Sequence, residues 1–192
     1  YKGKVFPVNP NRKEIFGLKC YPNLKSINEQ VDHIFVAVDG NKIIDAIEDA
    51  ISIKVRCASI LSGGFSEAGS EGNDLEKHIF KIAQKGDLRI LGPNSIGLIN
   101  ISDNVVLSAN AMLELKDLKK GSLGVISHSG SLIGALLAHG HSRGIGFSKL
   151  VSVGNELDLS VGEIGKMLVN DPNTETIILF LETLRNSNQV AE

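Results

Sequence analysis

Short apolar runs alternate with amphipathic segments along nearly the whole chain, and no other feature constrains the fold as strongly. Runs at 33–38, 56–62 and 89–94 have the composition of buried strands. Between them, apolar residues at helical spacing predict helices over 40–53 and 71–87, each with one apolar face. Strands that alternate with helices of about 10–15 residues form parallel sheets from βαβ units. The sequence therefore predicts an α/β protein.

The charged segment ELKDLKKGS, residues 114–122, interrupts this alternation and has no apolar face of useful width. It predicts a domain boundary that divides the chain into residues 1–118 and 119–192. We expect no single sheet to run through residues 105–125. Weaker β-like runs lie at 5–8, 95–102 and 105–110. After the boundary, strands and helices are predicted in turn at 122–127, 131–142, 148–153, 158–170 and 174–181.

Composition and charge exclude several classes of protein. The net charge of −2 and the pI near 6.2 leave no basic surface of the kind that nucleic acid requires. No apolar run approaches the roughly 20 residues of a membrane span. Cys20 and Cys57 lack the spacing of a metal or redox pair, so the cytoplasm is the expected location. The chain begins with Tyr1 rather than Met, and we expect a fragment in which both units are truncated.

In parallel sheets, ligands bind where the strands end. Small and polar residues follow the predicted strands at Asp39, Ser62–Phe65, Asn94, Ser127–Ser131, Gly154–Asn155 and Glu182. SHSGS at 127–131 joins a strand end to a helix N-terminus, and its hydroxyls and N–H groups suit an anion. An ordinary Ser-capped helix would have the same sequence. The segments 60–64 and 92–94 are either places where backbone approaches a ligand or plain turns.

Two titratable side chains at this edge are candidates for a chemical role. Glu182 ends the apolar run TIILFLE, so it is either a surface carboxylate or one placed to accept the N–H of a reacting imidazole. His128 has no carboxylate near it in the sequence, and a lone His in a polar loop is more often solvated or a cap. Because a helix N-terminus disfavours a cation, His128 is not expected to be phosphorylated. No metal site is predicted.

Four segments resemble those of one family: GPNSIG, SHSGSL, RGIGFSKLVSVGNELDLS and DPNTETIILFLE. They follow in unbroken order, and the whole chain resembles the CoA-binding part of the NDP-forming acyl-CoA synthetases. This superfamily includes the ADP-forming acetyl-CoA synthetases and the α subunit of succinyl-CoA synthetase. The resemblance implies a Rossmann-like CoA-binding domain followed by a flavodoxin-like parallel-sheet domain. It also implies a reaction in which acyl-CoA, ADP and phosphate yield free acid, CoA and ATP through a phosphohistidine.

The resemblance further implies roles for individual residues. The family's CoA contacts fall on Arg12 (or Lys13), Ser62, Gly63 and Gly64. The groups that hold phosphate match Asn94, Ser95, Gly97, Ser127, Ser129 and Gly130. The carboxylate that steadies the phosphohistidine matches Glu182, whereas His128 stands where relatives usually have Gln or Arg.

Several parts of such an enzyme are expected outside this chain. The glycine-rich loop for the CoA phosphates would precede Tyr1, and the phosphohistidine would follow Glu192. An ATP-grasp domain or subunit would supply ATP or ADP and Mg, and an oligomer is expected. A second interpretation is a CoA-sensing, non-catalytic module of a protein acetyltransferase. A third, an NAD-dependent oxidoreductase, needs a G-x-G-x-x-G motif that the sequence does not show, although the expected truncation would remove it.

Overall fold

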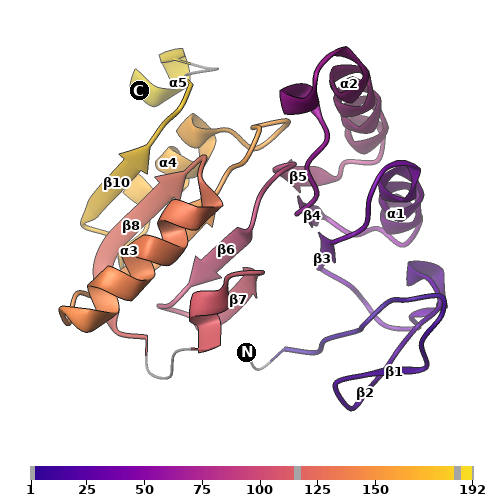
Figure 1. The fold of residues 1–192 in the computed structure, drawn as a ribbon, viewed down its shortest axis with the longest axis horizontal. Coiled ribbons are helices and arrows are strands. Elements are labelled where there is room, and N and C mark those ends of the chain that lie inside the picture. Colours follow the sequence, from indigo (N-terminus) through magenta and orange to yellow (C-terminus); the bar gives the residue numbers. More distant parts are fainter. Residues whose placement is uncertain (1–2, 115–117, 184–186, 192) are drawn as a thin grey trace.

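The computed structural model describes residues 3–114, 118–183 and 187–191. Figure 1 shows two groups of strands and helices, the first in purple and the second running from magenta to yellow. Each group has its own sheet. We call residues 3–91 the first unit and residues 97–191 the second unit.

A three-stranded parallel sheet forms the centre of the first unit, in the order β3–β4–β5. The strands are β3 (His33–Val36), β4 (Cys57–Ile60) and β5 (Arg89–Leu91). The two predicted helices are present as α1 (Asn41–Ser52) and α2 (Ser70–Lys85). Ile43, Ile47 and Ile79 on these helices are buried in one core with residues of the strands. This burial is the result that their helical spacing predicted.

The second unit has a five-stranded sheet in the order β10–β8–β9–β6–β7. Its parallel part comprises β8 (Lys120–Ser127), β9 (Phe147–Ser152) and β10 (Thr176–Phe180). Antiparallel β6 (Gly97–Asn100) and β7 (Val105–Ser108) complete it. The helices are α3 (Gly130–Ser142), α4 (Val161–Val169) and α5 (Ser187–Ala191). Since α3 packs with Val125 and α4 with Ile126, the two helices cover opposite faces of the sheet (Figure 1).

The chain does not pass from the first sheet to the second at the domain boundary that the sequence predicted. β7 precedes the charged segment 114–122 and β8 begins within it at Lys120, yet both strands belong to one sheet. The expectation that no sheet spans residues 105–125 is therefore wrong, and sheet membership changes earlier, between β5 and β6. The reason is the antiparallel pairing of β6 with β9, in which Leu98 stands opposite Val151. Residues 115–117 of the charged segment lie outside the described residues.

Local differences also have physical causes. The β-like run at 5–8 contributes only a bridge from Val8 to Tyr21, since Pro7 has no N–H with which to extend a ladder. The helix predicted over 158–170 begins at Val161, because Ser160 caps it by accepting the N–H of Glu163 over 3.2 Å. The remaining short elements are β1 (Glu14–Ile15), β2 (Leu18–Lys19), η1 (Leu24–Ser26), η2 (Ser66–Ala68) and η3 (Ala111–Glu114).

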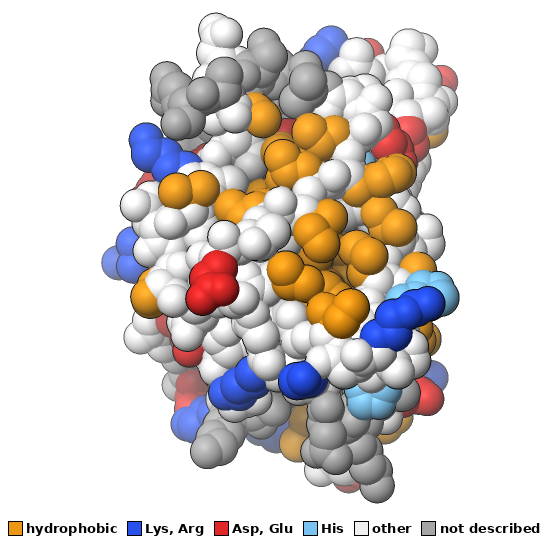
Figure 2. Space-filling model, turned by 90° about the vertical axis from the view of Figure 1, so that its left-hand side faces the viewer, with side chains coloured by type: hydrophobic (Ala, Val, Ile, Leu, Met, Phe, Trp, Pro, Cys, Tyr) orange, Lys and Arg blue, Asp and Glu red, His pale blue; other side chains and the backbone are white. Residues whose placement is uncertain are grey.

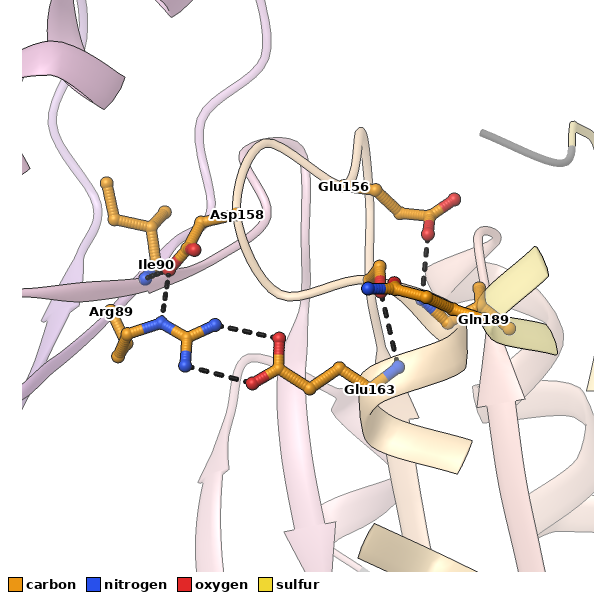
Figure 3. A network of polar contacts seen from close by, with 8 residues as sticks. Arg89, Ile90, Glu156, Asp158, Glu163 and Gln189 are labelled. Carbon is orange, nitrogen blue, oxygen red and sulfur yellow. Dashed lines mark hydrogen bonds and ion pairs between the residues drawn. The ribbon is translucent and has the colours of Figure 1, made fainter. Parts of the chain in front are cut away.

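The loop after β9 joins the two units. Residues 155–159 run beside residues 90–93, with main-chain hydrogen bonds of 2.9 and 3.0 Å. Figure 3 shows Arg89 at the same joint, where its Nε donates to Asp158 over 2.9 Å. Its two terminal nitrogens donate to Glu163 over 2.9 and 2.8 Å. Bidentate pairing fixes orientation as well as distance, so the start of β5 is held to the loop after β9 and to the first turn of α4.

One side of the second unit carries exposed apolar side chains. Figure 2 shows them gathered on the side of the molecule where β10 forms the edge of the sheet. Leu179 and Phe180 of this strand are 43% and 40% exposed. An exposed apolar edge of this kind is a template for a further strand. Within the described part of the chain, no helix has the length and apolar character needed to cross a membrane.

Candidate functional site

A pocket of about 360 Å³ lies at the carboxyl ends of parallel strands, and strands of both sheets contribute to it. It is lined by Leu61, Asn94, Ser95, Ile96, His128, Ser129, Gly130, Ser131 and Glu182. These residues follow β4, β5, β8 and β10, so they occupy the carboxyl ends of parallel strands, where ligands bind in such sheets. In the described ranges, no group of three or more His, Cys, Asp and Glu side chains is arranged to hold a metal ion.

The N-terminus of α3 forms one wall of this pocket. Ser129 is the N-cap, and its Oγ accepts the N–H of Leu132 over 3.4 Å. The first turn of a helix leaves N–H groups without intrahelical acceptors, and the helix dipole adds positive potential there. Glycine is needed at Gly130, because a Cβ would lie 2.5 Å from Cγ2 of Ile96. Among the described residues that line the pocket there is no Lys or Arg, and this wall offers an anion its N–H groups.

Three residues predicted to bind phosphate have polar groups that serve the fold. Ser127 is buried, and its Oγ donates to the carbonyl of Ser129 over 2.8 Å. Ser95 borders the pocket, but its Oγ donates to the carbonyl of Ser152 over 2.6 Å and accepts the N–H of Gly97 over 2.9 Å. Gly97 has a φ of +90°, and a Cβ there would lie 2.0 Å from the carbonyl oxygen of Leu107. Neither Ser127 nor Gly97 lines the pocket.

His128 is buried, and its ring is held on both sides. Its Nε2 lies 2.7 Å from Oε1 of Glu156, and its Nδ1 accepts the main-chain N–H of Glu182 over 2.9 Å. The side chains of His128 and Glu156 are 6% and 3% exposed. The expectation of a solvated His128 without a carboxylate partner is therefore wrong. The two residues meet because β8 and β9 are neighbouring parallel strands, with Ser127 opposite Ser152.

Glu156 is the residue of this site that the sequence analysis missed. Its φ of +53° is uncommon for a residue other than glycine. Its Oε2 accepts the N–H of Val161 over 2.7 Å, and Figure 3 shows it beside the first turn of α4. A carboxylate is stabilised by the positive end of that helix. The signal in the sequence was its position, directly after Gly154–Asn155 at a predicted strand end.

The predicted CoA residues after β4 are held by residues of the first unit, one of which contacts the loop that joins the units. The Oγ of Ser62 donates to the carbonyl of Val38 over 2.6 Å, and the N–H of Gly64 donates to Glu67 over 2.7 Å. Glu67 also accepts a hydrogen bond from Asn155 of the second unit. Burial acts to raise the pKa of Glu67, but the hydrogen bonds from Asn155 and from main-chain N–H groups outweigh it and lower the pKa.

The basic residues predicted to contact CoA lie elsewhere in the first unit. Arg12 and Lys13 are exposed just before β1. Figure 1 shows the β1–β2 hairpin and the segment after β4 at opposite ends of this unit. The structure therefore does not bring Arg12 and Lys13 into one pocket with Ser62–Gly64, and a ligand that contacts both must be extended.

Both parts of the chain match known families. Residues 1–101 match the family described as a CoA binding domain. Residues 120–192 match the succinyl-CoA ligase like flavodoxin domain. The fold agrees with these matches, because each part is built on a sheet with parallel strands and packed helices.

Similar curated proteins are CoA ligases. Acetate–CoA ligase [ADP-forming] II of Archaeoglobus fulgidus is 34% identical to 97% of this chain. The α subunit of acetate–CoA ligase [ADP-forming] II of Pyrococcus furiosus is 33% identical to 99% of it. The chain spans 28% and 40% of the lengths of these two relatives.

Solved structures have the same fold. A crystal structure of a Pyrococcus horikoshii OT3 protein superposes with a TM-score of 0.92 at 32% identity, covering 99% of this chain and 42% of that one. The dinucleotide forming acetyl-coenzyme A synthetase 1 of Ca. Korarchaeum cryptofilum, in complex with phosphate and ADP, gives 0.87 at 34% identity. That match covers 95% of this chain and 38% of the other. The chain therefore belongs to the CoA binding domain family, and its resemblance to the NDP-forming acyl-CoA synthetases is confirmed.

Proposed function

We propose that this chain is the CoA-binding portion of an NDP-forming acid:CoA ligase and that its pocket receives the transferred phosphoryl group. Glu182 is the residue that steadies the phosphohistidine. The observation that carries this proposal is the meeting of Glu182 with the N-terminus of α3 in one pocket. Ligases that align with nearly the whole chain favour this function over an acetyltransferase module or an oxidoreductase.

The pocket offers what such a transfer needs. The imidazole, supplied from outside this chain, attacks the phosphorus of the acyl phosphate, and the bond between phosphorus and the acyl oxygen breaks to release the free acid. Negative charge on the phosphoryl oxygens is met by the N–H groups at the start of α3. As the ring gains positive charge, Glu182 accepts the N–H of its other nitrogen. The chain's own contribution is thus electrostatic and positional.

The remaining parts of the reaction are proposed from the relatives. A Pyrococcus furiosus relative is an α subunit, which supports a partner subunit or domain of the ATP-grasp type here. The phosphate and ADP bound by the Ca. Korarchaeum cryptofilum enzyme support nucleotide use here. The ATP-grasp part would bind Mg together with the nucleotide. We propose an oligomeric enzyme that acts in the cytoplasm.

Replacement of Glu182 by Gln is expected to slow phosphohistidine formation by about 10- to 100-fold, the scale seen when a carboxylate that orients a metal-bound imidazole is replaced. The substitution keeps the shape of the side chain but removes the charge that stabilises the ring. CoA affinity should stay nearly unchanged, since Glu182 belongs to the phosphoryl pocket. The measurement is the rate of phosphate incorporation into the enzyme that carries this chain.

Glu175→Gln is the matched control, because Glu175 precedes β10 whereas Glu182 follows it. This variant makes the same chemical change at the opposite end of one strand and should react at the native rate. Phosphorylation of Glu182→Gln at the native rate, or phosphate incorporated at His128, would overturn the proposed roles.

CoA binding should depend on the exposed basic pair before β1. Replacing both Arg12 and Lys13 by Ala is expected to weaken binding by about 1–3 kcal/mol, the scale of hydrogen bonds to charged groups. Calorimetry with CoA measures the change. The control replaces Lys81 and Lys85, two exposed residues of α2, and alters net charge equally. Equal affinities for the two double variants would place the CoA phosphates elsewhere.

A further inference from the structure

The hydrogen-bond partners of His128 define the tautomer of its ring, because they differ in kind. A main-chain N–H can only donate, so Nδ1, which accepts from Glu182 over 2.9 Å, carries a lone pair. The proton of the neutral ring is then on Nε2, which donates to Oε1 of Glu156 over 2.7 Å. The second oxygen of Glu156 accepts the N–H of Val161 over 2.7 Å. A chain of three hydrogen bonds thus runs from the start of α4 to the main chain of Glu182.

These hydrogen bonds extend the pairing of β8 with β10 beyond the last residues of the regular ladder. The last paired residues of β8 and β10 are Ser127 and Phe180. The N–H of His128 donates to the carbonyl of Phe180 over 3.1 Å, as in a continuing parallel ladder. The next acceptor in such a ladder would be a main-chain carbonyl of the same strand. Here the imidazole of His128 takes that place and accepts the N–H of Glu182.

We propose that His128 and Glu156 are positioning residues that fix the main chain at Glu182 and thereby direct its carboxylate at the phosphoryl group. This inference rests on the proposed function of Glu182. His128 borders the pocket, but its two ring nitrogens are both engaged, so it acts through Glu182 and not on the phosphoryl group itself. Glu156 has both carboxylate oxygens engaged and acts through His128.

The two side chains differ in what can replace them. A Gln at position 128 keeps the pattern, because its carbonyl accepts from Glu182 while its amide donates to Glu156. Glu156→Gln breaks it, because His128 and Val161 meet different carboxylate oxygens and the amide replaces one of these acceptors by an NH2 donor. We therefore expect His128→Gln to react at close to the native rate. His128→Ala and Glu156→Gln should slow phosphohistidine formation by about tenfold or more.

A double-mutant cycle separates positioning from a structural role. In the intact enzyme, His128→Ala should slow phosphohistidine formation when Glu182 is present and have no further effect in a Glu182→Ala background. A residue that merely supports the fold would slow both backgrounds by the same factor, which would overturn the inference. Native-rate phosphorylation in Glu182→Gln would instead overturn the proposed function, so the two failures are distinguishable.

Nitrogen NMR of the ring gives a readout that does not depend on activity. For the native chain, we expect the NMR signature of the tautomer with the proton on Nε2, and the Glu156→Gln variant to lose this signature. A proton on Nδ1 in the native chain would overturn the inference. If His128→Ala does not fold, the isosteric Glu156→Gln variant takes its place in the double-mutant cycle. Unchanged CoA affinity in each variant shows that the first unit is intact.

Discussion

Acidification from pH 6.5 to about pH 4 is expected to cost the folded chain about 3 kcal/mol through His33 alone. Burial lowers the pKa of this side chain from 6.5 to about 4. His33 lies in β3, and its Nε2 is 2.9 Å from the Oγ of Ser59 in the neighbouring strand. Below pH 6.5 the unfolded chain binds a proton that the folded chain excludes until about pH 4. Stability is therefore lost as the pH falls through this window, and the loss ends below it.

Urea unfolding at several pH values between neutral pH and pH 4 measures this effect. The variant His33→Gln removes the titrating group, so its free energy of unfolding should fall less steeply with acidification than that of the native chain. His78→Gln is the control, because His78 is exposed on α2 and is not buried on folding. If the curves of the native chain and His33→Gln ran parallel, burial of a neutral His33 would not be the cause.

The secondary structure was predicted well because burial leaves a periodic pattern in the sequence. α1 and α2 match their predicted segments closely, since each has a clear apolar face. α3 also matches its predicted segment, although it is apolar around most of its circumference. The pairing of β6 with β9 could not be predicted in the same way. A run of four residues does not indicate its neighbour or its direction, so the partner sheet of β6 and β7 was missed. That pairing also explains why the predicted boundary is not a boundary between sheets.

The sequence predicted where in the fold the candidate site lies, but not which of its side chains face the pocket and which bond to the protein itself. The rule that ligands bind at strand ends placed Asn94, Ser129 and Glu182 at one edge, and they share a pocket. The sequence could not distinguish a hydroxyl that faces a ligand from one that serves the backbone, as that of Ser127 does. The sequence also did not indicate that His128 contacts Glu156, because this contact depends on the register of β8 and β9.

Replacement of Gly154 by Ala is expected to destabilise the chain by about 2–5 kcal/mol. Its φ of +56° costs about 1–2 kcal/mol for a residue with a Cβ. The new Cβ would also lie 2.0 Å from the carbonyl oxygen of Pro93 and 2.8 Å from that of Asn94. Both are main-chain atoms, so no rotamer change relieves the contact, and the backbone must shift at a cost of about 1–3 kcal/mol. Denaturant unfolding measures the loss.

The same shift should impair the candidate site. It separates the N–H of Asn155 from the carbonyl of Pro93, now 2.9 Å apart, and this bond helps to hold the two units together. It also moves Asn94, which lines the pocket, and Glu156, which holds His128. We therefore expect phosphohistidine formation to slow in any Gly154→Ala protein that remains folded.

Gly144→Ala is the matched control for Gly154→Ala, because Gly144 also has a positive φ, of +68°, but meets no main-chain atom. A Cβ there would have only Nζ of Lys119 near it, at 3.8 Å. The free energy of unfolding of this variant should fall by about 1–2 kcal/mol, the conformational cost alone. Its rate of phosphorylation should stay at the native value. An equal loss of stability in both variants would show that the close approach at Gly154 is not what matters. A Gly154→Ala protein that is destabilised but reacts at the native rate would show that the joint between the units and the pocket are independent, and that Glu156 tolerates movement of its own loop.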